Sequence, residues 1–342
     1  MKRIVSLLLT LTLAVGLTFS LASCKNGNQI KINPDKEHYV VGVIQLAPHP
    51  ALDAATEGFK AALSDALAKE GRTVEFKVQN AQGESAMCST IVNSFVSEDV
   101  DLIMANATAA LVTAYNATET IPILGTSITE YGVALSLNGF NGVVGANVSG
   151  TSDLAPLTEQ AQMMIDTLAL QAGAKVGLLY CSAEPNSLYQ VDVVEAYLQS
   201  KGMACTRYAF TDSNDLQTVA TTAANNCDAI YVPTDNTVAT NAATINNVCA
   251  DMKIPVFAGE EGICSGCGYA TLSISYYNIG AKTGEMAAAV LLGQEDITEM
   301  AIAYDEAPVK KYNEAACINL GIDVDALVAA GYVMIEGTEA TE

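Results

Sequence analysis

The chain has little positive charge, with 16 Lys and Arg against 38 Asp and Glu among its 342 residues. A surface this acidic repels the phosphate backbone of nucleic acids, so we exclude nucleic acid as a partner. It also argues against adsorption of the protein surface to anionic lipid. Half of the residues are hydrophobic, which is typical of a globular protein with a substantial core, and the length allows one large or two medium domains.

Histidine is scarce and tryptophan is absent. Only one cysteine pair, Cys264 and Cys267, has motif spacing, and a zinc site there would need about two more Cys or His ligands than the region offers. Flanking glycines predict a loop, which favours a structural or incidental pair over redox chemistry. We therefore predict no metal site and no cofactor, while the pairing of the eight cysteines beyond Cys24 stays open.

The common catalytic motifs are missing too. The sequence contains no G-x-S-x-G, G-x-x-x-x-G-K-S/T or H-E-x-x-H pattern. His49 is the single candidate catalytic histidine, and its place between Pro48 and Pro50 favours a loop residue or a pocket wall. We predict no catalytic residue and a protein that is not an enzyme.

The N-terminus has the pattern of an export signal. Lys2 and Arg3 precede an uncharged apolar run that is too short to be a convincing membrane span, and Leu21-Ala22-Ser23-Cys24 follows. This ending resembles a bacterial lipobox, which implies cleavage before Cys24 and a lipid on its thiol; the alternative is an ordinary signal peptide with an incidental cysteine. We expect a signal peptide over 1–23 and a flexible linker over 24–38, with the protein lipid-anchored on the extracytoplasmic face of the cell membrane.

Beyond residue 38 strands and helices alternate, and the pattern occurs twice. Short apolar runs predict strands, and apolar residues at helical spacing predict the helices between them. The predicted strands cover 40–46, 74–78, 102–105 and 122–125, then 176–180, 205–210, 229–232 and 255–258. This alternation indicates an α/β protein with two doubly wound parallel-sheet lobes.

In open parallel sheets a ligand binds beyond the carboxyl ends of the strands, so the residues there are candidates for a binding site. They are mostly short, uncharged and able to form hydrogen bonds, with carboxylates only in the second lobe. The predicted ligand-binding residues are Gln45, His49, Asn80, Gln82, Thr108, Ala109, Thr126 and Ser127 from the first lobe and Asn186, Ser187, Asp235, Asn236 and Glu260 from the second.

These groups suit a small amino acid. Thr108 at a helix start, with Thr126 and Ser127, offers hydroxyls and free backbone N–H groups for a carboxylate. Asp235, in the stretch Tyr-Val-Pro-Thr-Asp-Asn, follows a buried strand and could accept the ammonium, since an unpaired buried charge is costly. The alternative for Asp235 is a helix N-cap, and both roles could coexist.

Several segments together resemble one protein family. They include Asn80-Ala-Gln-Gly83, Asn147-Val-Ser-Gly-Thr-Ser-Asp153, Glu184-Pro-Asn-Ser187 and Tyr276-Tyr277. The chain is similar, over roughly 39–322, to substrate-binding lipoproteins of ABC importers, a periplasmic-binding-protein-like family with tryptophan- and tyrosine-binding members.

The resemblance implies a type I periplasmic-binding-protein fold with a three-crossing hinge near 142–148, 270–275 and 300–305. The first lobe would comprise 39–145 plus about 275–300, and the second 146–274 plus about 301–342. It further implies a monomer that binds an apolar, aromatic amino acid and delivers it to an ABC permease. The alternatives are a nucleoside or another small solute as the ligand, or an exported enzyme or adhesin on the same fold.

Overall fold

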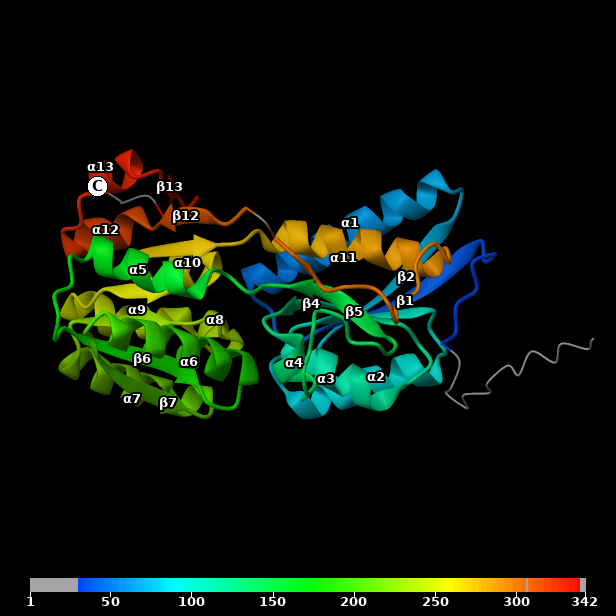
Figure 1. The fold of residues 1–342 in the computed structure, drawn as a ribbon, viewed down its shortest axis with the longest axis horizontal. Helices are drawn as coiled ribbons and strands as arrows, with labels where there is room; N and C mark the ends of the chain where they lie inside the picture. The colour runs from blue at the N-terminus through cyan, green and yellow to red at the C-terminus, as the bar shows by residue number, and fades with distance from the viewer. Residues whose placement is uncertain (1–29, 306, 339–342) are drawn as a thin grey trace, which may run out of the picture.

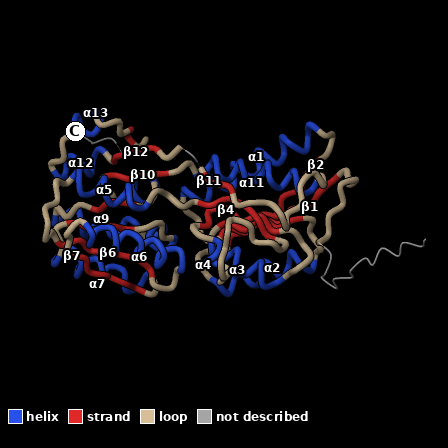
Figure 2. Tube along the Cα trace, viewed as in Figure 1, coloured by secondary structure: helices blue, strands red, loops and turns tan. Residues whose placement is uncertain are grey.

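The computed structural model describes residues 30–305 and 307–338, which form two lobes side by side (Figure 1). Each lobe is a sheet between layers of helices, and three chain segments connect the lobes (Figure 2). The predicted α/β class with two doubly wound lobes is confirmed.

The first lobe has strand order β11-β5-β4-β3-β1-β2, in which every pair is parallel. Helices α1 and α11 cover one face of the sheet, and α2 and α3 cover the other. The bounds are β1 His38–Gln45, α1 Pro50–Lys69, β2 Thr73–Asn80, α2 Ser85–Ser97, β3 Leu102–Asn106, α3 Thr108–Ala117, β4 Ile123–Ile128, α4 Tyr131–Ala134, β5 Val148–Ser152, α11 Tyr276–Leu291 and β11 Ala303–Tyr304.

The second lobe has strand order β13-β12-β10-β9-β8-β6-β7, with one antiparallel pair, β10 and β12. Helices α5, α6, α12 and α13 cover one face, and α7, α8, α9 and α10 the other. The bounds are α5 Leu157–Thr167, β6 Lys175–Cys181, α6 Pro185–Ser200, β7 Ala204–Phe210, α7 Ser213–Asn226, β8 Ala229–Val232, α8 Asn236–Thr240, α9 Ala242–Met252, β9 Val256–Ala258, α10 Glu261–Cys267, β10 Ala270–Ser273, β12 Val309–Tyr312, α12 Glu314–Leu320, α13 Val324–Ala329 and β13 Val333–Met334.

Both sheets repeat one strand order, with the first strand of each lobe between the second and the third. The switch point in such a sheet lies beside its first strand, where the flanking connections pass to opposite faces. The carboxyl ends of β1 and β3 in one lobe, and of β6 and β8 in the other, are therefore the expected place for a ligand.

The predicted lobe boundaries at 145 and 300 are too early. Strand β5 pairs with β4, and β11 pairs with β5, so both belong to the first sheet although the boundaries assigned them to the second lobe. The chain crosses between the lobes after Ser152, after Ser273 and after Tyr304. The cause is composition: β5 reads Val-Ser-Gly-Thr-Ser, which is typical of a connection, yet Gly150 lets its backbone pack closely on Gly125 of β4.

The predicted linker over 24–38 is also too long. Within its described part, Ile30 and Ile32 pack against the core of the first lobe, and Lys31 N donates to Thr120 O at 2.7 Å. Lys36 forms an ion pair with Asp101. The spacing of two isoleucines between polar residues is too short a pattern to predict this packing. The predicted signal peptide and the predicted lipidation of Cys24 lie outside the described residues.

The pair of cysteines with motif spacing lies on helix α10, not in the predicted loop. Both thiols are buried, and burial raises the pKa of Cys264 and of Cys267. A thiol with a raised pKa is a poor nucleophile at neutral pH, which disfavours the redox alternative. The thiols of the eight cysteines among the described residues are all free.

Helices α1 and α11 lie against each other with their backbones in close approach (Figure 1). A Cβ on Gly58 would lie 2.1 Å from Tyr277 O, and one on Gly280 would lie 2.0 Å from Ala55 O. Only glycine fits at these positions. This packing fixes the start of α11, and with it Tyr276, beside the cleft between the lobes.

Candidate functional site

A small cavity lies between the lobes, at the carboxyl ends of the strands; we call it the polar cavity. The first lobe contributes His49, Leu52 and Ser127, and the segments at the crossings contribute Asp153 and Tyr276. The second lobe contributes Asn186, Thr234, Asp235, Asn236, Ala239 and Glu260. No Lys or Arg of the described chain is among the lining residues, whereas three carboxyl groups are.

The lobes are in contact across this cavity. Its volume is about 10 Å³, which is at most the space for one water molecule. His49, the N-cap residue of α1, places its Nε2 3.2 Å from Asn236 Oδ1 at the start of α8. A ligand the size of an amino acid can therefore enter the polar cavity only if the lobes separate.

The orientation of the Asn236 amide fixes the tautomer of His49. Asn236 Nδ2 donates to Glu184 Oε2 at 2.8 Å, so Oδ1 faces His49 and accepts from its Nε2–H. Burial lowers the pKa of His49, which favours the neutral ring. His49 Nδ1 is then a buried acceptor, and no hydrogen-bond partner for it exists among the described residues.

Asp235 is both a helix cap and a wall of the polar cavity. One carboxylate oxygen accepts from Val238 N at 2.9 Å, as an N-cap of α8 does. The other accepts from Cys181 N at 2.7 Å and from Ser187 Oγ at 2.9 Å. A carboxylate has about four acceptor positions, so one is left for a ligand. Burial, and then the charge of Glu184, raises the pKa of Asp235 to about 8.

Glu260 repeats this arrangement at the end of β9. Its carboxylate caps α10 by accepting from Gly262 N and Ile263 N, and the residue is only 2% exposed. Burial raises the pKa of Glu260 to about 7. A cation in the polar cavity would lower the pKa of both acids and stabilise their charged forms.

Asp153 directly follows β5, at the first crossing between the lobes, and its carboxylate accepts from two hydroxyls of the first lobe. It accepts from Thr129 Oγ1 at 2.8 Å and from Tyr276 Oη at 2.9 Å. Asp153 is buried, and burial raises its pKa. Any charge that binds in the polar cavity therefore acts directly on a residue of the hinge.

Ser127 is presented to the cavity by a distortion of its strand. The register of β4 against β5 shifts between Gly125 and Ile128, and Ser127 has φ +57°, in the left-handed region. Such bulges redirect side chains near functional sites. Ser127 Oγ is buried, and no partner for it exists in the described part of the chain. A buried hydroxyl without a partner is costly, so Ser127 Oγ is suited to donate to a ligand in the polar cavity.

Of the predicted site residues, the structure brings six to the polar cavity: His49, Ser127, Asn186, Asp235, Asn236 and Glu260. Ser187 lies behind Asp235 and holds it. The others do not line this cavity: Gln45, Asn80, Gln82, Thr108, Ala109 and Thr126. Gln45 bonds within the lobe to Ala47 O and Asp53, and Thr126 Oγ1 lies 3.1 Å from Thr151 Oγ1.

Leu52, Thr234 and Ala239 of the lining were missing from the predicted set, and so were Asp153 and Tyr276, which lie beside the crossings between the lobes. The latter two lie in segments that carry the family resemblance. From the sequence, these segments are interpreted as parts of the hinge between the lobes and not as walls of a binding site. The sequence signal that could have identified Asp153 is an acid that directly follows a Gly-Thr-Ser stretch. It was missed because the predicted boundary at 145 assigned this stretch to the second lobe, whereas β5 is a strand of the first sheet.

This fold and site define a class: two-lobed proteins that close around a small solute at the switch points of two parallel sheets. Residues 40–329 match the family of ABC transporter substrate binding proteins, and the chain belongs to that family. A tyrosine-binding protein of Clostridioides difficile (strain R20291) is 34% identical over 302 residues, which cover 86% of this chain and 85% of that protein.

Two solved structures are informative about the arrangement of the lobes. An ABC domain from Streptococcus pneumonia in complex with L-Trp is 28% identical, with a TM-score of 0.79, over 86% of this chain and 99% of that one. A ligand-free, open substrate binding protein with adhesive properties from Clostridium difficile is 32% identical, with a TM-score of 0.65, over 87% and 100%. The TM-score is thus higher for the ligand complex than for the open structure, although the open protein has the higher sequence identity. This agrees with the contact of His49 with Asn236 across the cleft.

Among the described residues, no helix is both long and apolar enough to cross a membrane. They also contain no group of three or more His, Cys, Asp or Glu residues that could hold a metal ion. The lining of the polar cavity offers hydrogen-bonding groups and three carboxyl groups.

Proposed function

We propose that this substrate-binding protein captures an aromatic L-amino acid outside the cell membrane, to which a lipid on Cys24 anchors it, and delivers the ligand to an ABC permease. The observation that supports this most directly is the set of unmatched groups around the polar cavity. Within the part of the chain that the structure describes, three buried carboxyl groups line it without a Lys or Arg in the lining, and Ser127 and His49 each have a buried polar atom with no partner.

An amino acid supplies what these groups lack. Its ammonium offers three donors, and Asp235 has one acceptor position left; His49 Nδ1 is a second acceptor nearby. Its carboxylate can accept from Ser127 Oγ. The relatives bind tyrosine or carry L-Trp, which supports an aromatic side chain on the ligand.

Closure follows from the same contacts. The ammonium acceptor Asp235 belongs to the second lobe and the hydroxyl of Ser127 to the first, so a ligand is fully paired only when the lobes meet. A nucleoside has no ammonium and leaves the acids unneutralised. An enzyme would need a nucleophile or a metal beside His49, and the neighbour that the structure gives His49 is an amide.

The test is native mass spectrometry of protein purified without refolding, followed by calorimetry with L-Trp, L-Tyr, L-Phe and a nucleoside. We expect one unaltered aromatic amino acid per chain and no release of product over time. Stabilisation by the nucleoside alone, or turnover of the ligand, would contradict the proposal.

A further inference from the structure

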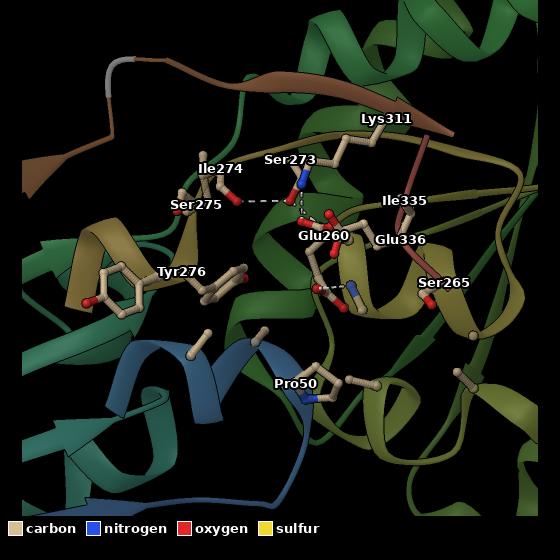
Figure 3. A pocket seen from close by; sticks show the side chains of 18 of the residues that line it. Pro50, Glu260, Ser265, Ser273, Ile274, Ser275, Tyr276, Lys311, Ile335 and Glu336 are labelled. Atoms are coloured by element: carbon tan, nitrogen blue, oxygen red, sulfur yellow. Dashed lines mark hydrogen bonds and ion pairs between the residues drawn. The ribbon is translucent and has the colours of Figure 1, made fainter. Parts of the chain in front are cut away.

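A second, larger cavity lies next to the polar cavity and also between the lobes (Figure 3). Its volume is about 650 Å³, within the range of roughly 300–1,000 Å³ that small-molecule sites occupy. Ala239, Glu260 and Tyr276 line both cavities, so these side chains lie between the two. The two spaces are therefore compartments of one cleft.

Small side chains from both lobes create this space. On the first lobe the wall is Ala51 and Ala54 in the first turns of α1. On the second it is Ala239 in α8 with Ala242 and Ala243 in α9. The lobes touch at His49 and Asn236, yet a void persists beside that contact because these opposing residues are alanines. We call it the alanine-walled cavity.

The polar cavity has no room for a ring. At about 10 Å³ in this arrangement of the lobes it is far smaller than an aromatic ring, so a ligand's small polar groups suit it better than its side chain. On the side of β3 and β4 the space is filled: Asn106 Nδ2 donates to Leu52 O at 2.8 Å and to Thr56 Oγ1 at 3.0 Å, and Thr126 is fully buried. The free volume adjoining the polar cavity lies on the side of Ala239.

The chemistry of the larger cavity suits an aromatic ring with a polar edge. Ile274 and the ring of Tyr276 form an apolar part of the wall (Figure 3). The ion pair of Lys311 with Glu261, together with Ser265, adds polar groups to the lining. A phenol or an indole can thus bury its carbon atoms and still hydrogen-bond its O–H or N–H.

From these contacts we propose that the alanine-walled cavity receives the ligand's side chain, and that Ala54 and Ala243 set the largest ring that fits. The proposal rests on the proposed function, because it assigns the side chain of the same ligand whose ammonium and carboxylate occupy the polar cavity. The small residues determine size selectivity, and the groups of the polar cavity determine that the ligand is an amino acid.

The test compares Ala54→Leu and Ala243→Leu with Ala61→Leu. Ala61 is exposed, lies seven residues after Ala54 on the same helix and does not line either cavity. Calorimetry on each variant measures the affinities for L-Trp, L-Tyr and L-Phe. We expect a loss of tenfold or more for L-Trp in both cavity variants, a smaller loss for L-Phe, and no change in Ala61→Leu.

Ala243 is exposed at the surface of α9, so Ala243→Leu keeps the test decisive if Ala54→Leu fails to fold. Unchanged affinity for L-Trp in the folded cavity variants, while the unaltered protein binds it, would overturn the side-chain assignment alone. If the unaltered protein binds no aromatic amino acid, the proposed function fails first and the assignment falls with it.

Discussion

His49 Nε2 lies 3.2 Å from Asn236 Oδ1 and so joins the N-cap of α1 in one lobe to the start of α8 in the other. Both residues are placed by helix starts that follow the carboxyl ends of central strands. The contact uses Nε2, and His49 Nδ1 stays a buried acceptor with no partner among the described residues.

We predict that His49→Ala lowers ligand affinity several-fold, because the closed form loses a hydrogen bond that contributes about 1 kcal/mol. Calorimetry gives the affinity, and small-angle scattering shows whether the ligand-free lobes separate. His38→Ala is the matched control, since His38 is exposed and contacts Thr73 within the first lobe. An equal loss in both variants would show that the effect is not specific to the cleft.

Asp235→Asn should reduce affinity for an amino acid by about 2 to 5 kcal/mol, because the ammonium loses its charged partner. Asparagine is also a preferred N-cap, so helix α8 should stay intact. Asp212→Asn provides the control: Asp212 caps α7 by accepting from Asn214 N, and it lies outside both cavities. If Asp235→Asn binds as tightly as the unaltered protein, Asp235 is only a cap.

Ser127→Ala separates binding from stability. The hydroxyl has no partner in the described chain, so its removal should leave the free energy of unfolding unchanged or slightly higher. Ligand affinity should fall by about 1.5 to 3 kcal/mol if Ser127 donates to a carboxylate. Ser149→Ala is expected to lower the free energy of unfolding and leave ligand affinity unchanged. Ser149 Oγ donates to Met300 O at 3.0 Å, and Ser149 does not line the cavity. Equal binding of the amino acid and its amide by the unaltered protein would contradict this role.

The stability of the ligand-free protein should fall as pH rises from about 4.5 to 7. Burial raises the pKa of Glu260 from its ordinary value to about 7, so the folded chain holds a proton that the unfolded chain has released across that window. The contribution of Glu260 to the free energy of unfolding is fully present below the ordinary pKa of the carboxyl group. It is lost as pH rises through the pKa that Glu260 has in the folded protein. In Glu260→Gln the midpoint of thermal unfolding should fall less over this pH range. The fall that is left comes from Asp235 and Asp153, whose pKa values burial also raises. A bound ligand should also reduce the decline, and identical pH profiles of variant and unaltered protein would refute the role of Glu260.

Cys24→Ala should release the protein from membranes, because the lipid on Cys24 is the proposed anchor and the acidic surface adds no attraction to anionic lipid. Fractionation of cells that express the variant and the unaltered chain measures this. Cys88→Ala, a substitution of a buried thiol in α2, serves as the control and should still sediment with membranes. Persistence of Cys24→Ala in the membrane fraction would mean that another feature holds the protein there.

The sequence by itself determined the alternation of strands and helices and the list of strand-end residues. These depend on local patterns, namely apolar runs, helical spacing and glycine stops, and the fold allows few topologies for such an alternation. Asp235 was identifiable in this way, because an acid directly after a buried strand lies at the switch-point edge wherever its neighbours lie.

Only the tertiary structure decided which strand-end residues meet. Thr126 and Ser127 are adjacent in sequence, yet the bulge in β4 directs Ser127 toward the cavity and leaves Thr126 bonded to Thr151. Asp153 and Tyr276 come together from positions 123 residues apart because α11 packs on α1 through glycines. Register shifts and close helix contacts arise from packing between distant segments, so no local pattern in the sequence encodes them.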